Sequence, residues 1–271
     1  MLKIGTSGFW FKDWVGTVYP EGTKSADALG YYVDKLGFNT VEINSTYYTL
    51  VSDKSFLGMD RKTPPGFEFT VKAYRGITHD PFDPKIPDNI KHPKMSDVPD
   101  TIDKFKYSLQ PIIQSHKLST VLLQMSPYFK PSPQSEEYLL MCKDSFGDIP
   151  LTLEFRGKEW NTDGTYTFLK THNFAYCVVD EPQLPRLMPF VPKTTSADIA
   201  YIRLHGRNLN WYKSYEDRYN YDYSAKELSE FIPVIQNFVN IVNKVLIFFN
   251  NCHAGSAAKN AMLMKQLIER I

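Results

Sequence analysis

The chain has 271 residues, of which 42% are hydrophobic and 23% are charged, and its formal net charge is +1. This length suits one large barrel or two small domains, and the apolar fraction is enough for a buried core. The near-zero charge excludes a global attraction to nucleic acid or membrane, so any site for a polyanion must be a local patch.

Three cysteines without CxxC spacing indicate reduced thiols, at Cys142, Cys177 and Cys252. The N-terminal residues MLKIGTSG begin directly with a strand-like segment. We find no signal peptide and no apolar run long enough to span a bilayer. We therefore expect a cytoplasmic protein that does not bind membranes, and the sequence leaves its oligomeric state open.

Eight short apolar segments predict strands. They are IGTSG from Ile4, VEIN from Val41, FTVK from Phe69, VLLQ from Val121, LTLEFR from Leu151, YCVVD from Tyr176, YIRLHGR from Tyr201 and LIFFNN from Leu246. Near-continuous apolar runs of this kind are typical of parallel strands covered on both faces.

Helix signals alternate with these strands. We expect helices over about 25–36, after Ser52, over about 101–116, from Ser132, from Ser224 to about 240, and from about 256 to the C-terminus. With no linker visible, the pattern predicts one α/β domain over residues 1–271, a TIM-type (β/α)8 barrel.

Two connections are long. Residues 79–99, after the third strand, are rich in Pro and Asp, and residues 207–224 follow the seventh strand. Long loops in compact domains are commonly lids or binding loops.

Each predicted strand ends in a polar side chain, and the carboxyl ends of the strands form the active site of a TIM barrel. Side chains alternate along a strand, so Glu42 shares a side with Asn44, Glu154 with Arg156, and Arg203 with His205. As acid–base groups we predict Glu42, Glu154, Asp180 and His205. As ligand-binding groups we predict Asn44, Lys72, Gln124, Arg156, Arg203, Arg207, Trp211, Tyr212, Asn250 and Asn251. The alternative is a buried ion-pair network that only fills the top of the barrel.

A divalent metal is a weaker alternative for this set. Glu42, Glu154, Asp180 and His205 offer suitable ligand atoms. Lys72 and Arg156 would then lie unfavourably close to the cation, so we expect no metal and no cofactor.

Two further segments suggest contacts to phosphate and bases. The turn from Asn250 to Ser256 leads into a helix, and helix N-termini in such barrels often hold phosphate. The loop 207–224 interleaves aromatic and basic residues, which suits stacking on bases or sugars. Each has a purely structural alternative, an ordinary capped turn and a loop that packs over the barrel. Ser7 is followed directly by glycine and does not match the GxSxG nucleophile motif.

These segments together resemble the bacterial family known as domain of unknown function 72, the YecE-like barrels. The resemblance rests on IGTSGFW, VEINSTYY, FTVKA with Ile77-Thr78-His79, LQMSP, LEFR with Trp160, Asp180 with Pro182, YIRLHGR and FFNN. It implies a TIM-type barrel and no established reaction. The family barrel is similar in outline to endonuclease IV and the xylose isomerase-like barrels, which suggests nucleic-acid binding by analogy only.

The chain departs from this family pattern at two places. Gly157 follows the EFR triplet where the family carries His, and Ser126-Pro127 stands in place of Pro-Pro. The first departure removes one acid–base group beside the fifth strand.

The leading hypothesis is a protein that binds a phosphate-bearing ligand, a small molecule or nucleic acid, at the charged mouth, with phosphodiester hydrolysis as the candidate reaction. One alternative is a carbohydrate enzyme that uses paired carboxylates. The other is a binding barrel that catalyses nothing. Two accessible carboxyls across an open cleft would favour sugars, whereas carboxylates engaged by arginine would not.

Overall fold

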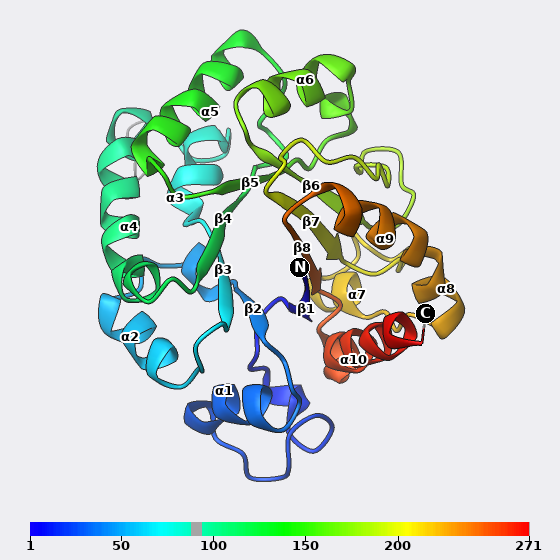
Figure 1. Ribbon diagram of the computed structural model, residues 1–271. Coiled ribbons are helices and arrows are strands. Elements are labelled where there is room, and N and C mark those ends of the chain that lie inside the picture. The colour runs from blue at the N-terminus through cyan, green and yellow to red at the C-terminus, as the bar shows by residue number, and fades with distance from the viewer. Residues whose placement is uncertain (88–93, 271) are drawn as a thin grey trace.

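The computed structural model describes residues 1–87 and 94–270, in which eight parallel strands form one sheet that curls into a barrel (Figure 1). Their order around the sheet is β1-β8-β7-β6-β5-β4-β3-β2. The TIM-type α/β fold predicted from the sequence is confirmed. The strands are β1 (Leu2–Thr6), β2 (Thr40–Ile43), β3 (Glu68–Lys72), β4 (Leu118–Gln124), β5 (Leu151–Glu154), β6 (Ala175–Asp180), β7 (Ile199–Leu204) and β8 (Lys244–Phe249).

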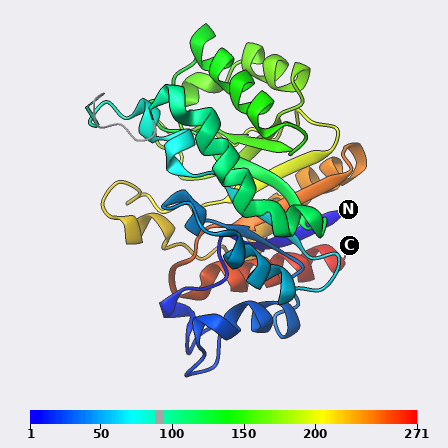
Figure 2. The ribbon, with the colours of Figure 1, turned by 90° about the vertical axis from the view of Figure 1, so that its left-hand side faces the viewer.

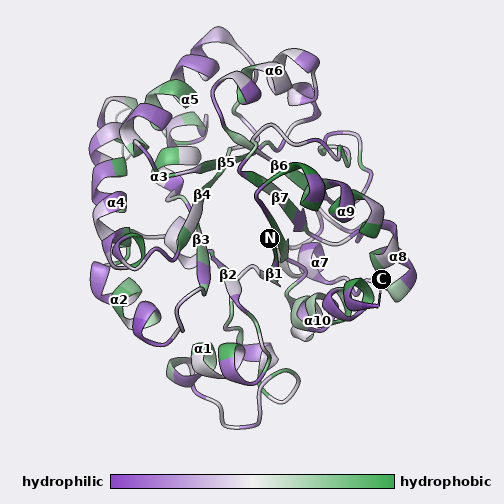
Figure 3. Cartoon of the chain, in the orientation of Figure 1, coloured by the Kyte–Doolittle hydropathy of each residue, from purple (hydrophilic) through white to green (hydrophobic). Residues whose placement is uncertain are grey.

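Ten α-helices of the described residues lie outside the strands, and most of them carry both hydrophilic and hydrophobic residues (Figure 3). They are α1 (Ser25–Asp34), α2 (Asp53–Arg61), α3 (Arg75–Thr78), α4 (Val98–Gln114), α5 (Pro133–Phe146), α6 (Asp163–Thr171), α7 (Tyr215–Tyr219), α8 (Ala225–Glu230), α9 (Ile232–Ile241) and α10 (Ser256–Glu269). No helix among the described residues is long and apolar enough to cross a membrane.

Two helix predictions need correction. The single helix expected from Ser224 to about 240 is two helices, α8 and α9, which meet at Phe231. Pro233 explains the break, because its ring lacks an N–H and clashes with the carbonyl four residues earlier. The capping box of Ser224 and Glu227 is present as expected.

The expected alternation of strands and helices also fails between β6 and β7. Residues 181–198 form no helix. The four prolines in this segment remove backbone donors and fix φ, which prevents a continuous helix; they are Pro182, Pro185, Pro189 and Pro192.

The two long connections lie beyond the carboxyl ends of the strands. The first was expected as an irregular loop over 79–99, but short helical turns occupy its start and end, and residues 88–93 lie outside the described residues. The connection after β7 carries α7 and projects from the barrel at the end opposite the two termini (Figure 2).

The barrel closes at a narrow seam between β1 and β2. Ser7 pairs with Glu42 in an isolated bridge, and the Gly8 N–H donates to the Glu42 carbonyl at 2.7 Å. By contrast, β1 pairs with β8 over five residues. At the seam Gly5 lies so near Thr40 that a Cβ on residue 5 would clash with the Thr40 carbonyl oxygen. Glycine is therefore required for the two strands to approach.

We predict that Gly5→Ala destabilises the protein by about 1–3 kcal/mol, because the added methyl forces the seam apart. Urea unfolding followed by circular dichroism measures the change. Gly30→Ala is the matched control, since Gly30 lies inside α1 with no atom within 4 Å of an added Cβ. This control should stabilise by up to about 1 kcal/mol. Equal stability of Gly5→Ala and the wild type would contradict the account of the seam.

Candidate functional site

A cavity of about 1340 Å³ opens at the carboxyl ends of the strands. Its floor consists of strand-end side chains, and its walls come from the loops after all eight strands. The polar floor residues are Ser7, Asn44, Lys72, Gln124, Arg156, Arg203 and Asn250. The predicted mouth and a real cavity therefore coincide.

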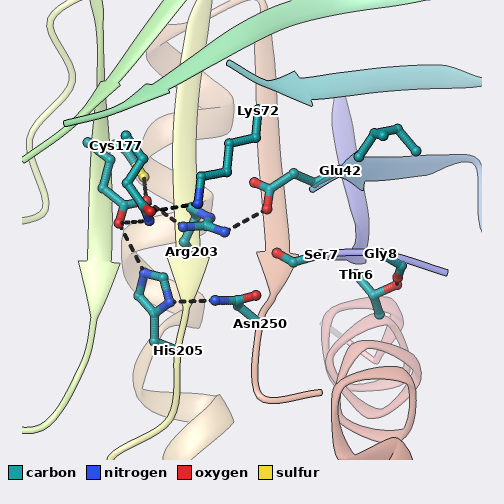
Figure 4. A network of polar contacts seen from close by, with 12 residues as sticks. Thr6, Ser7, Gly8, Glu42, Lys72, Cys177, Arg203, His205 and Asn250 are labelled. Carbon is teal, nitrogen blue, oxygen red and sulfur yellow. Dashed lines mark hydrogen bonds and ion pairs between the residues drawn. The ribbon is translucent and has the colours of Figure 1, made fainter. Parts of the chain in front are cut away.

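Arg203 occupies the centre of the floor (Figure 4). Its Nη1 donates to Glu154 Oε2 at 2.6 Å, and its Nη2 donates to Glu42 Oε1 at 2.7 Å. The three side chains are no more than 1% exposed. Tyr201 Oη donates to the second oxygen of Glu42 at 2.6 Å. One guanidinium thus joins β2, β5 and β7, and each charge is compensated where burial would otherwise make it costly.

The other carboxylate oxygen of Glu154, Oε1, lies near three further nitrogen atoms. Gln124 Nε2 donates to Oε1 at 2.6 Å, while Arg156 Nε lies 3.7 Å and His205 Nε2 3.5 Å from the same atom. Burial alone would raise the pKa of Glu154, but the charge of Arg203 and the neighbouring His205 hold that pKa well below its usual value. This carboxylate therefore stays ionised and engaged.

His205 lies beneath the cavity as a buried imidazole. Burial and the charge of Arg203 lower its pKa to about 4. Its Nδ1 is 2.9 Å from the Asn250 amide nitrogen, so the neutral ring accepts there. A neutral ring that touches no cavity surface is poorly placed to carry protons to a ligand.

Lys72 reaches the cavity from the end of β3. Its Nζ donates to Gln124 Oε1 at 2.7 Å and lies 4.2 Å from the centre of the Tyr47 ring. Burial, followed by the charges of Arg203 and Arg156, lowers the pKa of Lys72 to about 7. A sizeable fraction of this lysine is thus a neutral amine at neutral pH.

Besides Glu42, Glu154 and His205, which lie beneath the cavity, three further predicted members do not line it. Asp180 accepts from Arg207 Nε at 3.0 Å and from Tyr223 Oη at 2.6 Å. Asn251 Nδ2 donates to Asn260 Oδ1 at 2.7 Å and to the Tyr221 carbonyl at 2.8 Å. These contacts fix the loop after β7 to the barrel, so Asp180, Arg207 and Asn251 have structural partners here.

The position of Asp180 follows from strand alternation. Cys177 Sγ lies 3.8 Å from Glu154 Oε2, which places Cys177 inside the barrel. Asp180, three residues later, falls on the opposite face. Its place at the strand end predicts an inward side chain, and the structure corrects this prediction.

The predictions for the two remaining segments, the loop after β7 and the turn after β8, have different outcomes. Trp211 and Tyr212 line the cavity as expected. In the turn after β8, however, the Ala254 N–H donates to Asp13 Oδ2 at 2.7 Å. A carboxylate at this turn disfavours phosphate there.

Sequence reasoning assigned no role to several residues that shape the site. Tyr47 and His79 line the cavity and pack edge to face, with ring centres 4.9 Å apart. Arg186 and Arg218 lie on the wall, in loops whose course the sequence does not reveal. Tyr47 and His79 could have been found, because each closely follows a strand within the segments that carry the family resemblance.

Buried Glu181 was also missed. It accepts from the Met188 N–H at 2.9 Å, and burial raises the pKa of this carboxyl to about 7. It does not line the cavity.

Three polar atoms at the cavity floor have no hydrogen-bond partner. They are Ser7 Oγ, Asn44 Oδ1 and Arg203 Nε. Unpaired buried polar atoms are costly, and most are satisfied in native proteins. The three residues that carry these atoms all line the same cavity. Among the described residues, no group of three or more His, Cys, Asp or Glu side chains is arranged to hold a metal ion.

Comparison with known proteins gives a consistent result. The model of the family described as protein of unknown function DUF72 matches residues 3–270. The UPF0759 protein YunF of Bacillus subtilis is 32% identical, with 99% of this chain and 95% of that protein aligned. A crystal structure of a DUF72 family protein from Thermotoga maritima is 41% identical, covers 99% of both chains and superposes with a TM-score of 0.88. One from Enterococcus faecalis is 25% identical, covers 99% of this chain and 98% of that chain, and has a TM-score of 0.80.

Replacement of Arg203 by Met should destabilise the protein by about 3–5 kcal/mol at pH 7, because it leaves two buried carboxylates uncompensated. In the wild type, Glu154 has a lowered pKa, so its contribution is present above its ordinary pKa of 4.5 and is lost as the pH falls. The deficit of the variant should therefore shrink towards acid pH. Denaturant unfolding across this pH range measures both effects.

Lys130→Met serves as the control for that experiment. Lys130 pairs with Glu159 at 2.9 Å, and the two side chains are 53% and 48% exposed, so its loss should cost less than about 1 kcal/mol. A deficit in Arg203→Met that is no larger than this, or that does not change with pH, would contradict the central role of Arg203.

Proposed function

Because the chain belongs to the DUF72 family, whose description assigns no activity, we propose a function from its cavity: the protein binds a phosphate-bearing ligand at the carboxyl ends of β3, β5 and β7. The observation that carries this proposal is the separation of charge at the floor. The carboxylates Glu42 and Glu154 bind Arg203 below the cavity surface, whereas the cations Lys72 and Arg156 reach that surface.

The charged side chains of the cavity wall are mainly basic. Six are Lys or Arg and two are acidic, namely Lys72, Lys130, Arg156, Arg186, Arg203 and Arg218 against Asp13 and Glu159. The excess persists when buried Glu42 and Glu154 are added to the acids. A concave surface of one sign concentrates ligands of the opposite charge, although the whole chain is nearly neutral.

Arg156 and Lys72 are the groups best placed to contact a phosphate. Both line the cavity, and both extend from strands that the network around Arg203 holds in place. Charged donors on a rigid floor are suited to phosphate oxygens. The predicted role of the turn after β8 is not part of the proposal, because Asp13 already accepts from it.

The aromatic walls suit the remainder of such a ligand. Rings from four loops line the cavity above the floor, namely Phe9, Trp10, Phe11, Tyr47, Tyr48, Tyr128, Trp211, Tyr212 and Tyr219. Exposed ring faces stack on bases and sugars. The volume also exceeds the roughly 300–1,000 Å³ of ordinary small-molecule sites. A nucleotide or a short single strand fits these features.

Binding is better supported than hydrolysis by the carboxylates. Glu42 and Glu154 share one arginine and are no more than 1% exposed. Glycoside cleavage needs two carboxyls that face the substrate, one of them with a raised pKa. The lowered pKa of Glu154 argues against that role, so the carbohydrate alternative is not favoured.

The test is Arg156→Ala, measured by calorimetry with inorganic phosphate, a nucleoside monophosphate and a short single-stranded DNA. Loss of one charged hydrogen-bonding group should cost about 1.5–3 kcal/mol, which is roughly a tenfold or greater loss of affinity. Arg75→Ala, which removes a cation outside the cavity wall, should bind as the wild type does. Unchanged affinity in Arg156→Ala would refute the proposal. A steep salt dependence for the DNA alone would favour nucleic acid over a small molecule.

A further inference from the structure

Lys72 differs from Lys3, Lys117 and Lys244, the other lysines of the barrel that are buried or half-buried, in lacking a carboxylate partner. Lys3 and Lys244 pair with Glu68 at 3.1 and 2.5 Å, and Lys117 pairs with Asp60 at 2.9 Å. Among the residues that the structure describes, no carboxylate lies within ion-pair distance of Lys72. The nearby carboxylates Glu42 and Glu154 already bind Arg203.

Gln124 determines how the amine of Lys72 is held. The Gln124 amide nitrogen donates to ionised Glu154, which can only accept, so the amide oxygen must face Lys72. This oxygen accepts one hydrogen from Nζ, and the Tyr47 ring lies on another side. A neutral amine in this position retains a lone pair for a ligand in the cavity.

The surroundings favour that neutral form. Burial and the two arginines lower the pKa of Lys72 to about 7, whereas an ordinary lysine titrates near 10.4. The Tyr47 ring acts in the opposite direction, because a ring face stabilises an ammonium. A desolvated lysine beside other cations is a known way to activate an amine as a nucleophile.

From this geometry we propose that Lys72 is a nucleophile that forms an imine with a phosphate-bearing aldehyde or ketone in the cavity. The inference rests on the proposed function, since Arg156 and its neighbours would hold the phosphate while the carbonyl faces Nζ.

The reaction needs no oxidant, reductant or metal. The Nζ lone pair forms a bond to the carbonyl carbon, and the C=O π electrons move to oxygen. One proton leaves nitrogen and one reaches oxygen, which gives a carbinolamine. The nitrogen lone pair then expels the hydroxyl, which takes up a proton and leaves as water, and loss of the remaining N–H proton gives the neutral C=N bond.

The test uses pyridoxal 5′-phosphate, a phosphate-bearing aldehyde whose imine absorbs visible light, followed by borohydride reduction and peptide mapping. In the wild type at pH 7, label at Lys72 should exceed that at any other lysine by at least about tenfold, because an ordinary lysine is almost fully protonated there. Labelling should rise with pH and reach half its maximum near pH 7.

Two variants provide the comparison. Lys72→Arg keeps the positive charge but has no nucleophilic amine, so the imine absorbance should disappear. Lys193→Arg is the control, because Lys193 lies outside the cavity wall and pairs with Asp163 at 3.2 Å. It should label at Lys72 as the wild type does. Circular dichroism confirms that both variants fold.

The outcomes separate this inference from the proposed function. If the wild type binds inorganic phosphate but Lys72 is labelled no more than other lysines, imine formation is refuted and the phosphate site stands. Competition by inorganic phosphate, with weaker labelling by pyridoxal than by its phosphate ester, supports both. If pyridoxal labels Lys72 equally well and phosphate does not compete, the phosphate site and the substrate class are refuted while the reactivity of Lys72 remains.

Discussion

The pairing of Arg203 with Glu42 and Glu154 is the interaction on which the rest of the site depends. Three unrelated strands, β2, β5 and β7, each contribute one charged side chain to a place without solvent. None of these charges would be tolerated there alone, since an isolated buried ion costs several kcal/mol. Together they fix the relative position of strands that do not neighbour one another in the sheet.

This network also determines which charges a ligand meets. Arg203 binds the carboxylates from below, and the remaining polar groups at the floor are an amine, three amides, a hydroxyl and a second guanidinium. The cavity is therefore basic because its acids are engaged, and the near-neutral composition of the chain hides this asymmetry. The unusual state of Lys72 has the same origin, since the carboxylates that would have stabilised its charge bind Arg203 instead.

The sequence predicted the barrel and most of the floor for a simple physical reason. Parallel strands bring their carboxyl ends together, and alternation puts Glu154 with Arg156 and Arg203 with His205 on one face. Alternation assigns the two faces of a strand only when the direction of one of its side chains is known, however, and the sequence of β6 contains no such residue. Asp180 was therefore assigned to the wrong face, because a shift of one residue exchanges the two sides of a strand.

What the sequence could not provide depends on contacts between distant segments. That Arg203, rather than Lys72 or Arg156, would take both carboxylates is a matter of three-dimensional reach. The same holds for Asp13, which occupies the turn after β8 from 241 residues away. The missing helix between β6 and β7 is a different case, because the sequence itself shows four prolines in this segment. Their effect on the backbone is stronger than the general tendency of strands and helices to alternate.

The seam between β1 and β2 has a consequence for the order of folding. β1 is synthesised before the other seven strands. The strand with which it pairs over five residues, however, is β8, about 240 residues later. Loops this long are slow to close, so contacts of high sequence separation form late. While β8 is still inside the ribosome, β1 has only the single bridge to β2 available. The nascent chain must therefore carry an unpaired apolar strand until its last strand emerges, and this interval is when the protein is most exposed to aggregation.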